Sequence, residues 1–132
     1  MFSSIKTSKN NKQVVQELTR KLNLGAENVI ARIAFAYSLS KDKQLDLKQI
    51  QDAQGKEYSA KILFGEHLPY YIAMVCVHYD VYKDDKDIGR YVKMHVDDGL
   101  ELIHKEFGKS NLSGMEFLIQ KIEAGIKSLS ID

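Results

Sequence analysis

Two side chains one helical turn apart, His95 and Asp98, are the first candidates for chemistry in this sequence. An imidazole and a carboxylate at this spacing could share a divalent cation and activate water for strand cleavage. The other histidines, His67, His78 and His104, form no His-Glu-x-x-His motif with any neighbour. We therefore predict no metal site and interpret His95 as a histidine at the edge of the core. A metal-dependent nicking or hydrolytic enzyme that uses His95 and Asp98 remains an alternative hypothesis.

Other catalytic signatures are absent from the sequence. Cys76 lies in the apolar run 72–77, which predicts a small buried side chain rather than a reactive thiol. Asp85 and Asp87 resemble the start of a calcium loop, but Gly89 stands where the third oxygen ligand belongs. The chain has neither a nucleophile elbow nor a phosphate-binding glycine loop. The sequence thus disfavours an autonomous enzyme and predicts no cofactor.

Positive charge is concentrated near the N-terminus, although the net charge of the whole chain is only +1. Over the first 35 residues Glu17 and Glu27 are the only acids, against Arg32 and five candidate DNA contacts, Lys6, Lys9, Lys12, Arg20 and Lys21. Phosphate contacts need positive charge on one surface and no specific base code. A merely solvated basic helix explains these charges equally well. Lys9, Lys12, Arg20 and Lys21 do not all lie on one face of a helix. Several copies of the chain in an oligomer would therefore have to bring their cations together.

Hydrophobic periodicity predicts the scaffold that holds these residues. The length of 132 residues and a hydrophobic content of 44% fit one compact domain. Residues 2–7 predict a short strand or arm that has no partner strand of its own, so pairing would need a second chain. A helix over about 10–22 ends before Gly25. The next helix, about 27–39, has an apolar band too broad for one partner helix, so it is either central or an oligomer interface.

The rest of the chain also predicts mostly helices. Residues 40–55 indicate a surface connection, and 56–64 a half-buried strand or an extended crossover. The run from His67 to Tyr82 is almost wholly apolar or aromatic, which predicts the most buried helix. A fourth helix covers about 88–107. A fifth begins at the capping box Ser113–Glu116, with its apolar residues expected to face inward: Met115, Leu118, Ile119, Ile122, Ile126 and Leu129. The expected fold is mainly α, with about five helices after a start like that of ribbon–helix–helix proteins.

Membrane and export signals are missing from the sequence. It has no apolar stretch of 18 residues and no signal-peptide core, and its single cysteine cannot form an internal disulfide. We expect a cytoplasmic protein that does not span a membrane.

Three motifs in fixed order resemble the DNA sulfur-modification protein DndE family. They are Leu24-Gly25 followed by Asn28-Val29-Ile30-Ala31-Arg32-Ile33-Ala34-Phe35, then Gly55-Lys56-Glu57-Tyr58 with Leu63-Phe64-Gly65-Glu66, then His95-Val96-Asp97-Asp98-Gly99-Leu100-Glu101-Leu102. The resemblance implies one mostly helical domain over 1–132, with a basic arm and helix pair over 1–40 and a helical body over 57–132. Residues 108–132 match the family less well, and we treat them as an extension that could alter assembly.

The resemblance also implies a function, which is DNA phosphorothioation, the replacement of a non-bridging phosphate oxygen by sulfur. In that system a cysteine desulfurase and other sulfur-modification proteins handle the sulfur and ATP chemistry. A DndE-like chain is expected to bind duplex DNA, particularly nicked duplex, as a homo-oligomer, a tetramer. We expect structural or interface roles for four residues of the motifs: Arg32, Phe35, His95 and Gly99. The alternative hypothesis is a ribbon–helix–helix transcriptional regulator that binds one operator.

Overall fold

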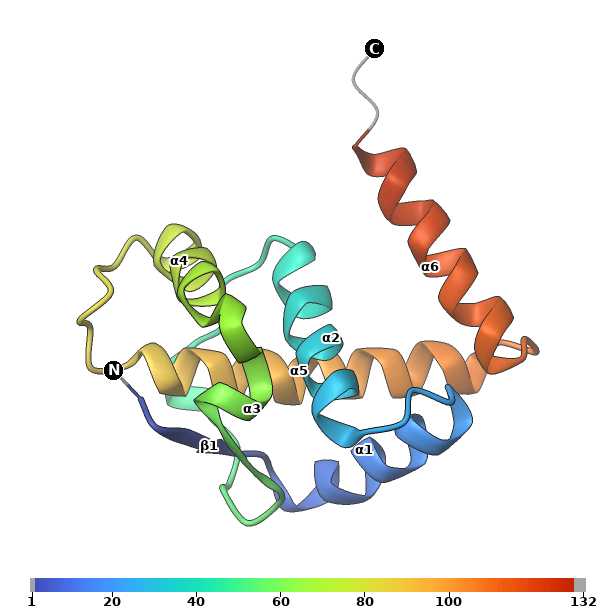
Figure 1. Cartoon of the computed structure of the whole chain (residues 1–132), viewed down its shortest axis with the longest axis horizontal. Helices are drawn as coiled ribbons and strands as arrows, with labels where there is room; N and C mark the ends of the chain where they lie inside the picture. Colours follow the sequence, from blue (N-terminus) through green and yellow to red (C-terminus); the bar gives the residue numbers. More distant parts are fainter. Residues whose placement is uncertain (1, 130–132) are drawn as a thin grey trace.

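The computed structural model describes residues 2–129, and within them a mainly helical fold surrounds one long helix, α5 (Figure 1). The elements in chain order are β1 (Ser4–Lys6), α1 (Lys9–Lys21), α2 (Glu27–Ser40), the 3-10 turn η1 (Leu47–Gln49), β2 (Glu57–Ser59), α3 (Ala60–Phe64), the 3-10 turn η2 (Gly65–His67), α4 (Leu68–Tyr79), α5 (Ile88–Lys109) and α6 (Gly114–Ser128). The predicted fold class, mainly α with a short N-terminal strand, is confirmed.

Helix α5 is the axis of the core because one side of it is apolar along most of its length. Five large apolar side chains at helical spacing are buried there: Ile88, Val92, Val96, Leu100 and Ile103. Helix α2 crosses α5 at Gly99, where an added Cβ would overlap the backbone of Ala34. The ring of Phe35, from the same part of α2, packs edge-on against Phe64 at 5.0 Å between centroids. The broad apolar band of α2 therefore serves the core, although Ile33 remains 36% exposed.

Helix α4 is not the most buried helix, so that prediction was wrong. Of its described residues Ile72 and Val75 are buried, whereas Tyr70 is 71% and Val77 85% exposed. Cys76, expected in the core, is partly exposed. Apolar residues all round a helix do not indicate which side is covered. Because α4 packs on the outside of the α5 axis, only one of its faces finds a partner (Figure 1).

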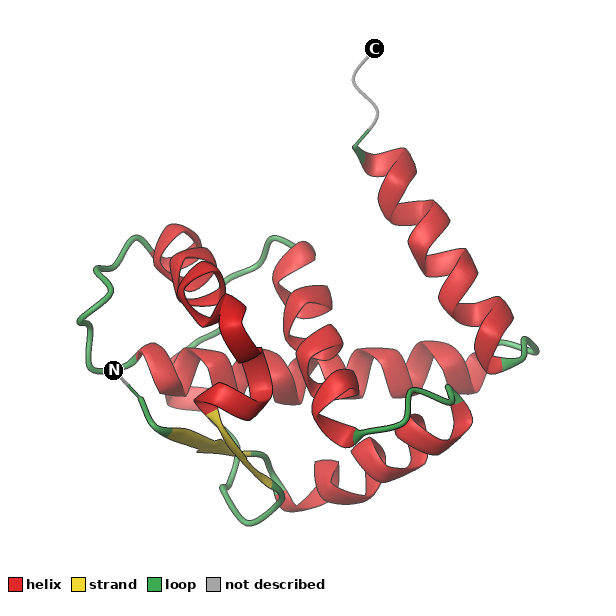
Figure 2. Ribbon diagram, in the orientation of Figure 1, coloured by secondary structure: helices red, strands yellow, loops and turns green. Residues whose placement is uncertain are grey.

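The N-terminal strand finds its partner within the same chain, so the expectation that it needs a second chain was wrong. Strand β1 pairs antiparallel with β2, and the two strands form the small sheet in Figure 2. Ile5 faces Tyr58 in this register, and both side chains are buried. The strand predicted over 56–64 stops at Ser59, whose hydroxyl accepts a hydrogen bond from the Ile62 amide and caps α3.

Helix α6 projects from the end of α5, away from the other helices (Figure 1). It begins at the predicted cap, where the Ser113 hydroxyl accepts from the Glu116 amide at 3.2 Å. Phe117 is buried against Phe107 and holds the first turns on α5. The inward orientation predicted for its apolar stripe was wrong, because the stripe lies on the opposite side of the helix from Phe117. Its exposed members are Met115, Ile119, Ile122, Ile126 and Leu129, while Leu118 is partly buried.

Candidate nucleic-acid interface

The outer face of α1 carries most of the cations that the sequence proposes for DNA. Asn11, Val15 and Leu18 are buried, which turns the opposite side of the helix to solvent. Lys9, Gln13, Gln16 and Arg20 follow one another at helical spacing on that side, with Lys12 beside them, and all five are exposed. We call these five residues the basic face of α1. Lys9 and Arg20 are eleven positions apart, which corresponds to roughly 16 Å along the helix axis.

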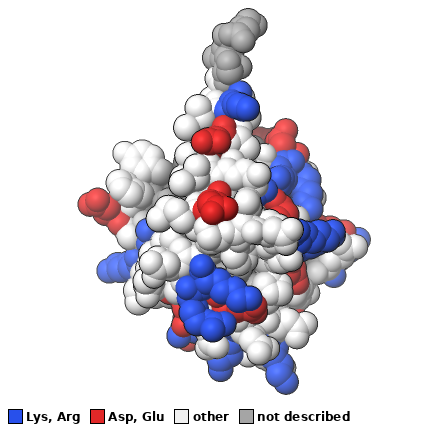
Figure 3. Space-filling model, turned by 90° about the vertical axis from the view of Figure 1, so that its right-hand side faces the viewer, with Lys and Arg blue, Asp and Glu red and all other residues white. Residues whose placement is uncertain are grey.

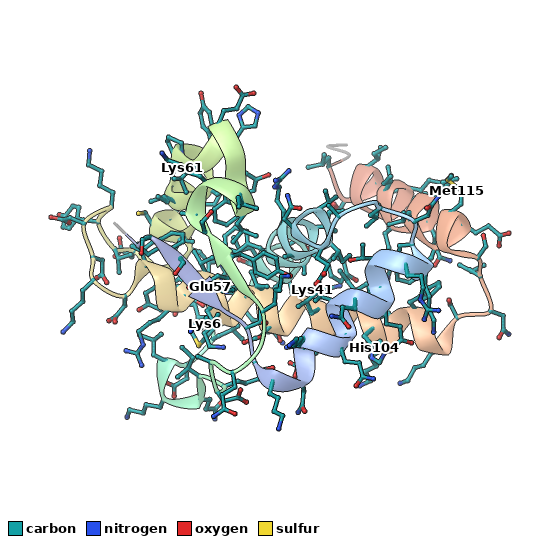
Figure 4. The ribbon with its side chains drawn as sticks, turned by 60° about the horizontal axis from the view of Figure 1, so that its bottom comes forward. Lys6, Lys41, Glu57, Lys61, His104 and Met115 are labelled. Atoms are coloured by element: carbon teal, nitrogen blue, oxygen red, sulfur yellow. The ribbon has the colours of Figure 1, made fainter. Side chains whose placement is uncertain are left out.

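Lys21 lies at the edge of this face and has an acidic partner. Its ammonium group lies 2.6 Å from the Glu17 carboxylate, one turn earlier. The hydrogen bond and charge of Lys21 lower the pKa of Glu17. His104 of α5, labelled in Figure 4, is 3.4 Å from the other oxygen of the same carboxylate. Part of the charge of Lys21 is therefore already balanced within the chain.

Lys6 is separate from the α1 cations because it lies on β1. It is exposed, and its register partner across the sheet is Glu57, as the neighbouring labels in Figure 4 show. Acidic side chains also interrupt the positive charge on the view in Figure 3, where Lys and Arg alternate with Asp and Glu. The structure thus groups Lys9, Lys12 and Arg20 on one face and pairs Lys21 with Glu17. The Asp52 carboxylate lies at the start of this face, where it accepts a hydrogen bond from the Lys9 amide at 2.8 Å.

A buried carboxylate on α5 fixes the position of α1. Asp97 accepts hydrogen bonds from the Ser8 amide at 3.0 Å and from the Asn11 side chain at 2.8 Å. Its other oxygen pairs with Lys93 at 2.7 Å, and Lys93 also donates to the Asp52 carbonyl. The sequence analysis missed Lys93 as a buried residue. The available signal was an i,i+4 Lys–Asp pair placed inside the apolar stretch of a helix.

His95 lies in a closed hydrogen-bond network between α2, α4 and α5. Its Nδ1 is 2.7 Å from the Ser38 hydroxyl and its Nε2 is 2.5 Å from the Tyr79 hydroxyl. Ser38 donates to Asp98 at 2.6 Å, so Nδ1–H must donate to Ser38 and Nε2 must accept from Tyr79. Burial, assisted by the nearby His78, lowers the pKa of His95 to about 4.

This network bears on the metal hypothesis. Both ring nitrogens of His95 are engaged and the side chain is fully buried, so neither nitrogen faces a cation site. Among residues 2–129, no group of three or more His, Cys, Asp or Glu side chains is arranged to hold a metal ion.

Arg32 lies on the side of α2 that faces α3, away from the basic face of α1. Its Nε donates to the Leu63 carbonyl at 2.6 Å, and Nη2 donates to the Ile62 carbonyl at 3.3 Å. These carbonyls belong to the last turn of α3 and have no partner further along that helix. Arg32 therefore ties α2 to the end of α3.

Comparison with known protein families identifies the family of this chain. The family model described as DNA sulphur modification protein DndE matches residues 4–111, from β1 to just beyond α5. The chain belongs to the DndE family. DndE proteins take part in DNA phosphorothioation, the process in which this chain is therefore placed. A search of curated protein sequences gives no match.

Two solved structures share the DndE fold with this chain. One is DndE from Escherichia coli B7A, involved in DNA phosphorothioation modification, with 17% identity and a TM-score of 0.62. The other is a DndE G21/24K mutant, also at 17% identity, with a TM-score of 0.65. Each match covers 78% of this chain and 98% of the solved chain. The DndE family match ends before α6 begins. Among residues 2–129, none of the helices is long and apolar enough to cross a membrane.

Proposed function

We propose that this DndE-family chain is the DNA-binding accessory subunit of the phosphorothioation system, and that it binds duplex DNA, including nicked duplex. The observation that supports this most is the basic face of α1. On this face Gln13 and Gln16 lie between Lys12 and Arg20, and their amides can also donate hydrogen bonds to phosphate oxygens. The nearest acid on α1, Glu17, lies at the margin and pairs with Lys21.

The dimensions of this face suit a phosphate backbone. Its roughly 16 Å length is comparable to about five base-pair steps along the duplex axis, at a rise of about 3.4 Å each. Three cations on one chain give weak binding, so the proposal includes a homo-oligomer, a tetramer, that presents several such faces to one duplex. Lys6 and Lys21 would add contacts where DNA phosphates compete with Glu57 and Glu17. Its protein partners would be the other sulfur-modification proteins. The complex would act in the cytoplasm.

The operator-binding alternative has less support. A ribbon–helix–helix protein reads bases with strands contributed by two chains, whereas β1 here pairs with β2 of its own chain. The nicking hypothesis needs His95 free to bind a metal, and both of its nitrogens are engaged. Backbone binding without base-specific contacts fits the exposed lysines and amides of α1 better.

Salt dependence tests the proposal most directly. Affinities for intact and nicked duplexes of the same sequence, measured by fluorescence anisotropy, should fall steeply with salt. Three phosphate contacts predict a log–log slope of about −2.7 and a loss of about 40-fold between about 50 and 200 mM salt. An oligomer that engages more than one face should show a steeper slope. An affinity that does not change with salt would overturn the mechanism, and strong preference for one operator sequence would favour the regulator.

A further inference from the structure

Among residues 2–129, nothing covers the second half of α6. Every residue from Ile122 to Leu129 is exposed. The first half of the helix is attached to α5 through Phe117 and through the ion pair of Lys121 with Glu106. A 15-residue helix that includes Gly125 has marginal stability in water without packing. An exposed apolar stripe on such a helix indicates an interaction surface.

The spacing of the stripe identifies the kind of surface. Met115, Ile119, Ile122, Ile126 and Leu129 are separated by four, three, four and three residues, which is the spacing of a coiled-coil seam. Their exposed fractions run from 47% to 76%. Figure 4 shows Met115 on the outer side of α6. The seam is thus available along its whole length, on the opposite side from the residues that hold α6 to the body.

We propose that this seam binds the α6 helices of other copies of this chain, in a parallel, in-register bundle. A second copy is the occupant we infer, because identical apolar seams can interdigitate without a second sequence and no a or d position carries a charge that would repel a like helix. The inference goes beyond the proposed DNA binding and does not depend on it. It also lies outside the region that matches the family model, which stops at residue 111.

Charge at the edges of the seam favours the parallel arrangement. With Ile119 and Ile126 at a positions, Glu116 and Glu123 occupy e positions, and Leu118 occupies a g position. An antiparallel pair would bring e positions together and oppose glutamate to glutamate. A parallel pair brings the e position of one helix to the g position of its neighbour, where Leu118 and Gly125 carry no charge and the glutamates meet no like charge. Isoleucine at both a and d in the middle of the seam favours more than two helices.

The size of the seam limits the strength of the contact. Five partly exposed side chains make a patch on the order of a few hundred Å², below the roughly 800 Å² per partner of a standard stable interface. We therefore expect association through α6 alone to depend on protein concentration. The α6 contact would also reinforce any interface formed by the rest of the chain, outside α6.

Cysteine crosslinking of the full chain tests the contact and its direction. In a Cys76→Ala background, Ile119→Cys should form a disulfide-linked dimer under mild oxidation, because a parallel pair brings position 119 of both copies together. The matched control Gln120→Cys, one position away on the polar side, should remain monomeric on a non-reducing gel. Crosslinking that needs a mixture of Ile119→Cys and Leu129→Cys chains, an a position with a d position, would overturn the parallel arrangement.

Native mass as a function of concentration is the second measurement. Ile122→Lys with Ile126→Lys should shift self-association to at least tenfold higher concentration, with the helical circular dichroism of the body retained. Gln120→Lys with Ser128→Lys adds the same charge off the seam and should leave association unchanged. If neither the seam variants nor the cysteine variants differ from their controls, α6 does not pair with itself. In that outcome the seam belongs to a different partner protein and the proposal is wrong.

Discussion

The backbone amide of Ser8 donates a hydrogen bond to the buried carboxylate of Asp97 at 3.0 Å, and this contact joins the first turn of α1 to the middle of α5. The same carboxylate oxygen accepts from the Asn11 side chain, while Lys93 binds the other oxygen. This carboxylate therefore fixes the first turn of α1 on the body, while the buried side chains of Val15 and Leu18 hold the rest of the helix.

Asp97→Ala should lower the free energy of unfolding by about 3–5 kcal/mol, the usual cost of breaking a buried ion pair from one side. The variant leaves the Lys93 ammonium and the Ser8 amide without their acceptor. Urea denaturation followed by circular dichroism measures the change. Asp84→Ala, at an exposed position, is the control and should stay within about 0.5 kcal/mol of the parent. Equal stability of the two variants would contradict the anchoring role of Asp97.

A pair of glycine substitutions in α5 tests the crossing with α2. Gly99→Ala should destabilise the fold by about 1–3 kcal/mol or more, because the new Cβ would overlap backbone atoms of Ala34 that cannot rotate away. Gly108→Ala in the same helix meets nothing within 4 Å and should stabilise it by about 0.5–1 kcal/mol. Urea midpoints that move in opposite directions would support the close crossing, and a neutral Gly99→Ala would exclude it.

The burial of His95 predicts a pH dependence of stability. Its pKa is about 4 in the folded chain, against about 6.5 for an ordinary histidine, so the unfolded chain binds the extra proton first. The contribution of neutral His95 to the stability of the fold is therefore fully present above about pH 6.5 and is lost as the pH falls toward 4. The loss from this residue reaches up to about 3 kcal/mol. His95→Gln should flatten the fall in urea midpoint across that window. His67→Gln, an exposed control, should keep the slope of the parent chain.

The sequence was sufficient for those parts of the fold that local rules determine. The cap at Ser113 and the end of the first helix before Gly25 follow from short-range chemistry, and both are present in the structure. The pairing of β1 was missed because it joins residues about 50 positions apart, and three-residue strands carry almost no periodicity. The covered face of α4 could not be identified, because apolar side chains surround that helix on every side.

The same limit applied to the candidate site. The cations of α1 were identifiable by type, but which of them are balanced by acids depended on structure. Glu17 is close enough in sequence to suggest its pairing with Lys21, whereas Glu57 meets Lys6 only through the sheet register. The buried position of Lys93 contradicts the usual preference of lysine for solvent, and its i,i+4 spacing to Asp97 within an apolar stretch was the sequence signal for it.

Arg32 should matter for stability and not for DNA. Arg32→Gln removes hydrogen bonds to the carbonyls of Leu63 and Ile62 at the end of α3, and should cost about 1.5–3 kcal/mol of unfolding free energy. Its affinity for duplex DNA, measured below the unfolding range, should match that of the parent chain. A salt slope reduced by about 0.9 in this variant would instead assign Arg32 a phosphate contact.

The basic face of α1 gives the most direct test of the proposed function. Lys9→Gln, Lys12→Gln and Arg20→Gln together should lower the magnitude of the log–log salt slope by about 2.7 per engaged chain, because each substitution removes one counterion-releasing contact. The three side chains are exposed, so stability should change by less than about 0.5 kcal/mol each. Lys48→Gln, Lys83→Gln and Lys127→Gln remove the same charge elsewhere on the surface and form the control. If both triple variants lose affinity equally, net charge rather than the α1 face determines DNA binding.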